Sequence, residues 1–403
     1  MRAILAALLF LSITATAQNT TTDSIKPKEN KPEKKWFESI SVRGYMQLRY
    51  NRLLETNNDL GCEQCDKSWG GNGGFFIRRM RIIFFGQLSK QVYFYVQPDF
   101  ASAASTDKQH FAQLRDAYID VGLDSKNEFR FRIGQSKVPY GFENMQSSQN
   151  RLPLDRADAT NSGVANERDL GIFFYWAPSH IRTLYSELVR SGLKGSGDYG
   201  VIGVGAYNGQ TANQYDLNND NHVAARISYP VKIKNQIIEG SVQAYNGKFI
   251  LPKSNLSSGV KYKSDLSYTD QRAAVSFVLY PKPFGVLAEY NMGKGPEYNS
   301  VTDSIETKDL TGGFITLCYM TRIKSHVITP FVRMQYYSGG KKHERDARSY
   351  SVNDSELGIE WQASKNFELT AMYTISNRRY EDHLLPSNKQ DGSLLRLQAQ
   401  LNF

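Results

Sequence analysis

Arginines stand at alternate positions in many segments of the chain, where polar and apolar residues take turns. The ten that share this pattern are Arg43, Arg49, Arg79, Arg81, Arg130, Arg132, Arg226, Arg272, Arg333 and Arg396. Successive side chains of a β-strand point to opposite faces, so these arginines should line one face. A guanidinium group binds phosphate or carboxylate through two parallel hydrogen bonds, and rings of Arg or Lys favour anions in a pore. The pattern indicates anion-binding chemistry on an inner surface.

The same face also carries acids, so a second interpretation stays open. Asp116, Asp120 and Glu289 fall on it, and the arginines could pair with such acids and merely solvate the wall. For any single arginine this pairing is the simpler explanation, because charged groups that leave water are normally paired. Ten arginines on one inferred face favour a modest bias toward anions.

The elements that carry these residues have the period of two that is typical of strands. In residues 41–51, Val42, Met46 and Leu48 alternate with Arg43 and Arg49. The sixteen segments with similar alternation are 41–51, 75–88, 91–99, 113–122, 128–135, 169–177, 199–208, 222–230, 237–247, 271–280, 284–293, 311–322, 326–338, 355–363, 366–378 and 393–403. A weaker segment, Ile181–Val189, is interpreted as an extension of a neighbouring strand, because single-chain bacterial barrels have an even number of strands.

The composition of the 403-residue chain excludes several other classes. A mean hydropathy of −0.49 excludes a helical membrane bundle, since each helical span needs about 20 apolar residues. Three cysteines exclude a disulfide-dense scaffold, and 12% aromatic residues argue against a disordered chain. The 24 Tyr and 21 Phe instead fit strands with aromatic girdles at two membrane interfaces.

The intervals between the strands alternate in length. Residues 89–90, 124–127 and 282–283 are short turns, whereas 54–74, 136–168, 248–270, 294–310 and 339–354 are long loops. Short periplasmic turns and long outer loops are typical of an outer-membrane barrel. The sequence therefore predicts an all-β fold for residues 37–403: a 16-stranded antiparallel transmembrane β-barrel in the bacterial outer membrane.

Two segments precede this barrel. Residues 1–17 have a charged Arg2, an apolar stretch from Ile4 to Ile13, and small residues that end at Ala17. This pattern predicts a secretory signal peptide. Residues 18–36 are polar and rich in Lys and Pro. Such a segment cannot bury enough apolar surface to offset its ordering entropy, so we expect a flexible periplasmic arm.

The longest interval, residues 136–168, mixes charges of both signs. Its bases are Lys137, Arg151, Arg156 and Arg168, and acids that include Glu143, Asp155, Asp158 and Glu167 are as numerous. A long ordered loop is usually functional. Folded into the barrel, it would narrow a pore and set its selectivity. An exposed outer loop is the alternative.

At this point the residues resemble those of a known family. The segments GFFIRRMRIIFFGQL, LRDAYIDV, FRFRIGQSKVPYGFEN, FVRMQYYSGGKKHERDAR and LGIEWQASKNFELTAMYT are similar to segments of the phosphate-selective porin O and P family. The resemblance runs from about residue 40 to Phe403, and QSKVPYGFE is its most specific part.

This resemblance implies a trimeric 16-stranded barrel whose third outer loop folds inward, with an anion path lined by Arg and Lys. Lys137 matches the lysine before proline in the most specific stretch, and Arg79 and Arg81 match the arginines of the second strand. Phe403 looks like the terminal signal that the barrel assembly machinery reads. The implied surroundings are outer-membrane lipid and lipopolysaccharide, and the implied solutes are small anions.

The remaining reactive residues offer little chemistry. Cys62 and Cys65 are predicted to form a loop-closing disulfide in an oxidising compartment, and Cys318 an inert buried thiol. The histidines show no ligand spacing, so we expect no metal, no cofactor and no catalytic residue. There is also no nucleic-acid motif.

We expect passive diffusion of small hydrophilic solutes, with a preference for anions such as phosphate. A barrel enzyme is the first alternative, and His343 between Lys342 and Glu344, close to Asp346, is its only local candidate. A structural barrel without an open pore is the second alternative.

Overall fold

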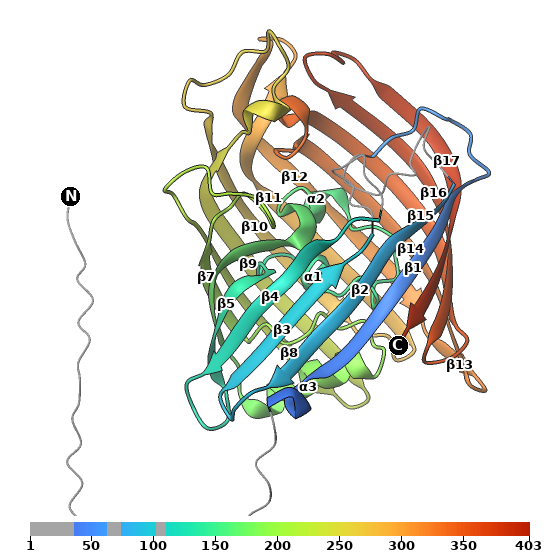
Figure 1. Ribbon diagram of the computed structural model, residues 1–403. Helices are drawn as coiled ribbons and strands as arrows, with labels where there is room; N and C mark the ends of the chain where they lie inside the picture. Colours follow the sequence, from blue (N-terminus) through green and yellow to red (C-terminus); the bar gives the residue numbers. More distant parts are fainter. Residues whose placement is uncertain (1–35, 63–73, 102–109) are drawn as a thin grey trace, which may run out of the picture.

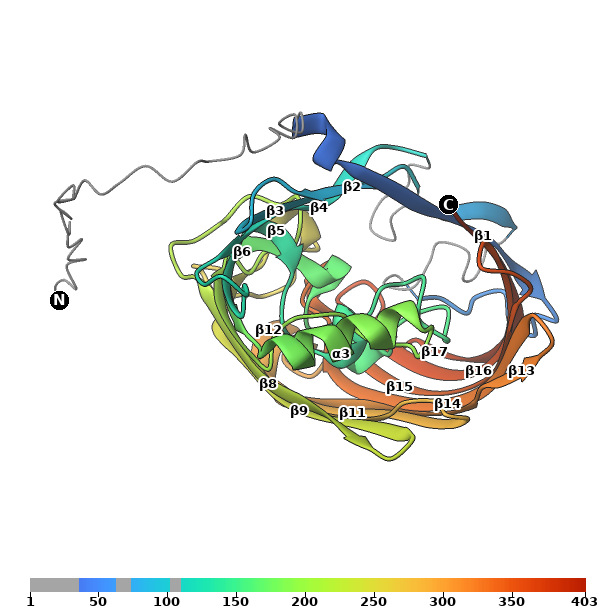
Figure 2. The same cartoon turned by 90° about the horizontal axis from the view of Figure 1, so that it is seen from below.

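Each strand of the chain pairs antiparallel with the next along the sequence, and β1 closes the ring by pairing with β17 (Figures 1 and 2). The computed structural model describes residues 36–62, 74–101 and 110–403. The predicted signal peptide and residues 18–35 of the predicted arm lie outside these described residues. The arm's last residue, Trp36, begins a short 3-10 helix, η1 (Trp36–Ser39).

The described residues form 17 strand segments. Their bounds are β1 Ser41–Leu53, β2 Phe75–Gln87, β3 Val92–Asp99, β4 Gln113–Gly122, β5 Phe129–Lys137, β6 Arg168–Trp176, β7 Ile202–Tyr207, β8 His222–Ile233, β9 Gln236–Ile250, β10 Ser267–Leu279, β11 Phe284–Asn299, β12 Ser304–Tyr319, β13 Thr321–Ile323, β14 His326–Gly340, β15 Ser349–Gln362, β16 Phe367–Glu381 and β17 Lys389–Asn402. The short β13 continues β12 after Met320, and both pair with β14. Counted as one strand, they give the 16-stranded antiparallel barrel that the sequence predicts.

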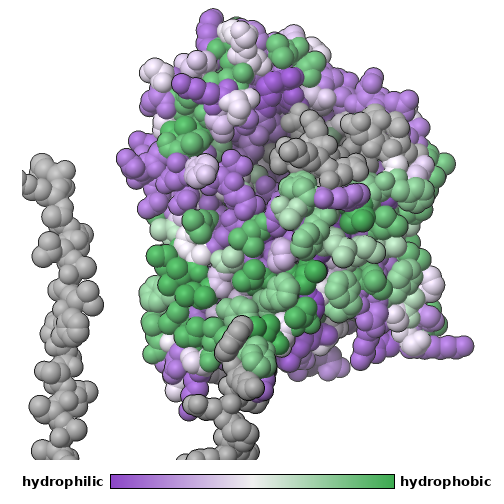
Figure 3. Space-filling model, viewed as in Figure 1, coloured by the Kyte–Doolittle hydropathy of each residue, from purple (hydrophilic) through white to green (hydrophobic). Residues whose placement is uncertain are grey.

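Alternation of exposure along the strands separates a lipid face from the interior. In β8, Val223 and Ile227 are 50% and 62% exposed, whereas Arg226 between them is 2% exposed. Figure 3 shows hydrophobic residues gathered in a band over the strands and hydrophilic residues above it. This arrangement is the apolar belt of a transmembrane barrel.

The two ends of the barrel differ as predicted, with one exception. Short turns at 88–91, 234–235, 324–325 and 363–366 share an end with η1 and the C-terminus, so this end is periplasmic. Several outer loops are shorter than predicted, because β11, β12, β14 and β15 extend beyond the expected strand ends. The exception is residues 177–201, a long connection at the periplasmic end.

That connection contains helix α3 (Ser179–Arg190), so the interpretation of Ile181–Val189 as a strand extension is wrong. Ile181, Tyr185 and Leu188 are its buried residues, and their spacing of four and three is that of one helix face. They pack against Phe142 and Ile237 inside the barrel. None of the described helices is long and apolar enough to cross a bilayer.

The seam between the first and last strands is closed by the terminal residue. Gly44 N donates to Phe403 O at 2.7 Å, and Phe403 N donates to Gly44 O at 3.0 Å. A Cβ atom at Gly44 would lie 2.6 Å from both the Phe403 ring and the carbonyl oxygen of Arg81. Glycine is therefore needed here, because the ring covers the backbone.

We expect Gly44→Val to weaken this seam, because the added side chain would push the Phe403 ring and β2 away. Overpacking of this kind costs about 1–3 kcal/mol. The measurement is the temperature at which the folded band is lost in heat-modifiable gel migration. Gly240→Val is the matched control, since nothing lies within 4 Å of a Cβ placed at Gly240. Equal unfolding temperatures for both variants would contradict the prediction.

Candidate functional site

The loop between β5 and β6 (residues 138–167, here called the inner loop) lies inside the barrel (Figure 2). It contains the one-turn helices α1 (Phe142–Met145) and α2 (Asp158–Asn161), followed by η3 (Ala165–Glu167). Its residues contact β11, β14, β16 and β17 on the far wall. Of the two alternatives that the sequence left open, a loop folded into the barrel is therefore correct and an exposed outer loop is not.

Arginines of the far wall and of β1 hold the inner loop by its acids. Asp155 lies 3.2 Å from Arg49 and also bonds Arg396. Glu143 lies 3.0 Å from Arg333, and Asp158 lies 2.9 Å from Arg378. Buried charges are stable only when they are paired. The acids of the inner loop thus have a structural role, because they neutralise arginines of the barrel wall.

Further hydrogen bonds between the inner loop and the wall complete the attachment. Glu289 of β11 accepts hydrogen bonds from Phe142 N at 2.6 Å and Thr160 Oγ1 at 2.8 Å. Tyr140 donates its hydroxyl proton to Asn291 Oδ1 at 2.6 Å. Arg272 donates to the Ser162 hydroxyl oxygen at 2.8 Å. These bonds satisfy backbone and side-chain groups of a segment that has left water.

The ion pairs keep the loop acids charged. Burial alone would raise the pKa of Asp158, but Arg378 and Lys341 lower it to about 2. Burial would likewise raise the pKa of Asp155, whereas Arg49, Arg396 and Arg78 hold it well below its usual range. Both carboxylates therefore remain ionised, and the loop stays anchored, over the ordinary range of pH.

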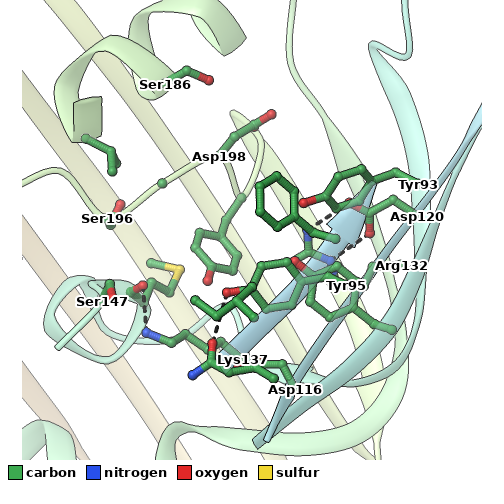
Figure 4. A pocket seen from close by; sticks show the side chains of 18 of the residues that line it. Tyr93, Tyr95, Asp116, Asp120, Arg132, Lys137, Ser147, Ser186, Ser196 and Asp198 are labelled. Carbon is green, nitrogen blue, oxygen red and sulfur yellow. Dashed lines mark hydrogen bonds and ion pairs between the residues drawn. The ribbon is translucent and has the colours of Figure 1, made fainter. Parts of the chain in front are cut away.

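Lys137, at the end of β5, supports the inner loop at its base. Its Nζ donates to Met145 O at 3.0 Å and to Gln146 O at 2.8 Å, and lies 3.5 Å from Glu167 Oε2. The side chain is 6% exposed. The lysine thus fixes the end of α1 and also borders a cavity (Figure 4).

This cavity, here called the periplasmic vestibule, has a volume of about 650 Å³. It lies between strands β1–β5, the inner loop and residues 182–199, and reaches down to the turns near Gln91 and Asn127. The bases that border it are Arg43, Arg130, Arg132, Lys137, Arg168, Arg182 and Arg190, and the acids are Asp116, Asp120 and Asp198. Seven bases against three acids give this space a positive excess.

Each acid of the vestibule is already paired. Asp120 accepts two hydrogen bonds from Arg132, at 2.7 and 2.8 Å, and Asp116 lies 2.9 Å from Arg168. Asp198 lies 2.8 Å from Arg130 and 2.9 Å from Arg182. Among the described residues, no carboxylate lies within ion-pair distance of Arg43 or Arg190, and both are exposed.

The structure thus divides the predicted anion-binding residues into two groups. Arg43, Arg130, Arg132 and Lys137 border the vestibule. The other eight are buried and bonded to the protein, among them Arg272, which bonds Ser162, and Arg396, which pairs with Asp155. Arg49 and Arg333 hold the inner loop, Arg81 pairs with Asp99 and Arg226 with Glu239, Arg79 donates to Gln47, and Arg151 donates to loop carbonyls. Direct contact of these eight with a passing anion stays a prediction.

Sequence reasoning missed residues whose position depends on irregular structure. Arg182 and Arg190 belong to α3, which alternation could not reveal. In β2, a register shift pairs Gln47 with Arg79 but Leu48 with Ile77, so Arg78 is an extra residue in a β-bulge. Arg78 is half-buried, and its charge is one of those that lower the pKa of Asp155 in the inner loop. Strict alternation assigns it to the lipid face.

The residues considered above for enzyme catalysis or metal binding contact groups that have a structural role. His343 is half-buried and packs edge-on against the Phe249 ring, and desolvation together with Lys342 holds its pKa well below its usual range. Glu344 and Asp346 bond Tyr350 and Ser257 rather than His343. No group of three metal-ligating side chains occurs among the described residues.

Cys62 is disulfide-bonded, but Cys65 lies outside the described residues, so their pairing stays a prediction. Cys318 is free and buried, as expected.

Comparisons with known proteins agree with this geometry. Residues 54–403 match the family phosphate-selective porin O and P, whereas a search of curated proteins finds no match. The chain is similar to the outer membrane channel DcaP of Acinetobacter baumannii, with 15% identity, a TM-score of 0.56, and coverage of 90% of this chain and 97% of that one.

Two further solved structures, an outer membrane protein and a porin, are similar at lower identity. In-vitro folded OmpT of Vibrio cholerae, in its trimer form, shares 10% identity with a TM-score of 0.50, covering 91% of this chain and 100% of that one. An anion-selective porin from Comamonas acidovorans shares 9% with a TM-score of 0.52, covering 91% and 99%. These likenesses show the porin fold. Since the family match spans nearly the whole barrel, the chain belongs to the phosphate-selective porin O and P family and is an outer-membrane porin, a channel rather than an enzyme.

Proposed function

We propose that this porin passes small hydrophilic solutes by passive diffusion and prefers anions such as phosphate. The observation that carries this proposal is the charge of the periplasmic vestibule, where seven bases face three acids. The acids are neutralised by ion pairs, so the surplus charge belongs to residues such as Arg43 and Arg190. A cavity lined by one sign of charge raises the local concentration of the opposite ion.

The preference for anions over cations should be modest. A unit charge acts on an ion about 8 Å away in water with only about 0.5 kcal/mol, and salt screens it further. Buried arginines that are paired with carboxylates add little to the field in the pore. Phosphate is supported by the family to which the chain belongs and by the affinity of guanidinium groups for phosphate oxygens.

The surroundings of the porin follow from the same proposal. A homotrimer is supported by the trimeric form of the similar OmpT. We further propose export by the signal peptide of residues 1–17 and recognition of Phe403 by the barrel assembly machinery. The folded barrel would then lie among outer-membrane lipid and lipopolysaccharide. A structural barrel without a pore is the remaining alternative, and conductance distinguishes it.

We expect the double variant Arg43→Ala/Arg190→Ala to lose much of its anion preference, because it removes the two vestibule arginines that have no carboxylate partner in the part of the chain that the structure describes. The anion-to-cation permeability ratio should fall about twofold for each charge, once salt has screened the Coulomb energy to about 0.2 kcal/mol per ion. The measurement is the reversal potential in planar bilayers under a salt gradient.

The control for this experiment is Arg322→Ala, which removes an exposed arginine of β13 that does not border the vestibule. An unchanged reversal potential in the double variant would refute the assignment of selectivity to these residues. Absence of stepwise conductance in the native protein would refute the pore itself.

Lys137→Met should change conductance more than selectivity. The lysine donates to two carbonyl oxygens of the inner loop, and loss of such charge-assisted bonds costs about 1–3 kcal/mol. The base of the loop should become mobile, and single-channel recordings should show larger current fluctuations. Lys137→Arg keeps the charge and serves as the comparison. If Lys137→Met only shifts the reversal potential and leaves the current steady, the lysine acts on ions rather than on the loop.

A further inference from the structure

Planar side chains are stacked along one wall of the periplasmic vestibule. The rings of Tyr95 and Tyr118 lie 5.2 Å apart at an angle of 12°. The guanidinium carbon of Arg132 lies 3.9 Å from the Tyr118 ring centroid. Asp120 holds this guanidinium through two hydrogen bonds (Figure 4). Strands β3, β4 and β5 thus contribute one planar group each to a column.

The column continues into ring surfaces that border the cavity. Tyr93 of β3 and Phe85 of β2 both line it, and Arg43 lies 5.4 Å from the Phe85 ring centroid. Among the described residues, Tyr93 has no ring partner and its hydroxyl makes no hydrogen bond. It is only partly buried. A flat ring in the vestibule could therefore stack on Tyr93 without displacing a protein contact.

Polar groups without protein partners border the same space. Arg130 is 3% exposed, and its NH1 makes no hydrogen bond in the structure. Ser196, on the opposite side of the cavity, is 7% exposed, and its hydroxyl oxygen also lacks a partner. Buried polar atoms normally have hydrogen-bond partners. Both atoms are shielded from the open cavity, so a solute in the vestibule reaches them only after a neighbouring side chain shifts.

The size and chemistry of the space fit an organic molecule rather than a bare inorganic ion. Small-molecule sites span about 300–1,000 Å³, are lined by aromatic side chains, and contain a few polar groups that fix orientation. The vestibule has about 650 Å³. Its aromatic surfaces suit a ring, and its arginines suit a carboxylate. A site that only attracts inorganic anions needs the positive charge of the arginines but has no use for aromatic side chains.

We propose that the vestibule is a binding site for ring-bearing carboxylates on their way through the pore. The ring stacks on Tyr93 beside the Tyr95–Tyr118–Arg132 column. The carboxylate accepts hydrogen bonds from the exposed Arg43, and a small side-chain shift brings Arg130 NH1 within its reach. This inference rests on the proposed porin function and adds a solute class to it. Sugar acids and aromatic acids share this chemistry, and the test separates them.

The experiment records single channels of the full-length porin in planar bilayers while solutes are added at the periplasmic side. Glucuronate is the sugar acid, and benzoate is the aromatic acid. Acetate has the charge without the ring, and glucose has the ring without the charge. We expect glucuronate or benzoate to interrupt the current at concentrations at least tenfold below those needed with acetate or glucose. If only one of these two acids blocks the current, that acid shows whether the site takes sugar acids or aromatic acids.

Variants then assign the block to the aromatic wall. Tyr93→Ala should weaken the block about three- to tenfold, as expected for loss of an aromatic contact, and Tyr93→Leu should weaken it similarly while it preserves packing. Tyr229→Ala is the matched control, since Tyr229 faces lipid and is 47% exposed. Heat-modifiable migration establishes that each variant is folded.

The outcomes separate this inference from the pore function. Stepwise conductance without selective block by either ring-bearing acid would overturn the inference and leave the pore intact. A block that is unchanged in both Tyr93 variants would also overturn it. Absence of conductance in the native protein would refute the proposed function itself.

Discussion

The interior of this barrel depends on ion pairs between arginines of the wall and acids of one loop. A closed sheet of 16 strands encloses more space than its own side chains can fill. The chain fills part of that space with residues 138–167, whose buried acids are stable only beside guanidinium groups. Asp155 between Arg49 and Arg396, Glu143 beside Arg333, and Asp158 beside Arg378 fix the loop against β1 and the far wall.

Where the loop attaches also decides where solutes can pass. The inner loop and α3 pack together on the side of β9 and β10, through Phe142, Ile181 and Ile237. The periplasmic vestibule remains on the side of β1–β5. The charge that matters for permeation is the charge left after pairing, so the net charge of +9 says little about selectivity. Arg43 and Arg190 contribute to this field because no described acid neutralises them.

The arginine pattern illustrates how far sequence reasoning reaches into the site. Alternation correctly placed Arg130, Arg132 and Arg226 on the inner face, because the period of two is a local property of extended backbone. Alternation could not tell that Arg132 meets Asp120 whereas Arg43 meets no described acid, since partners come from other strands or loops. A bulge in β2 interrupts the period at Arg78, and alternation alone does not reveal the bulge.

The sequence by itself determined the barrel, its strands, the lipid and inner faces, and the distinction between turns and most loops, because each of these follows from local periodicity and turn residues. It also indicated the family through the stretch around Lys137. Only the tertiary structure decided that residues 138–167 turn inward, that residues 181–189 form a helix, and which arginines remain unpaired. The inward course of the loop depends on contacts between residues more than 100 positions apart, such as Asp155 with Arg49 and Arg396. The free energy of such contacts has no local signature in the sequence.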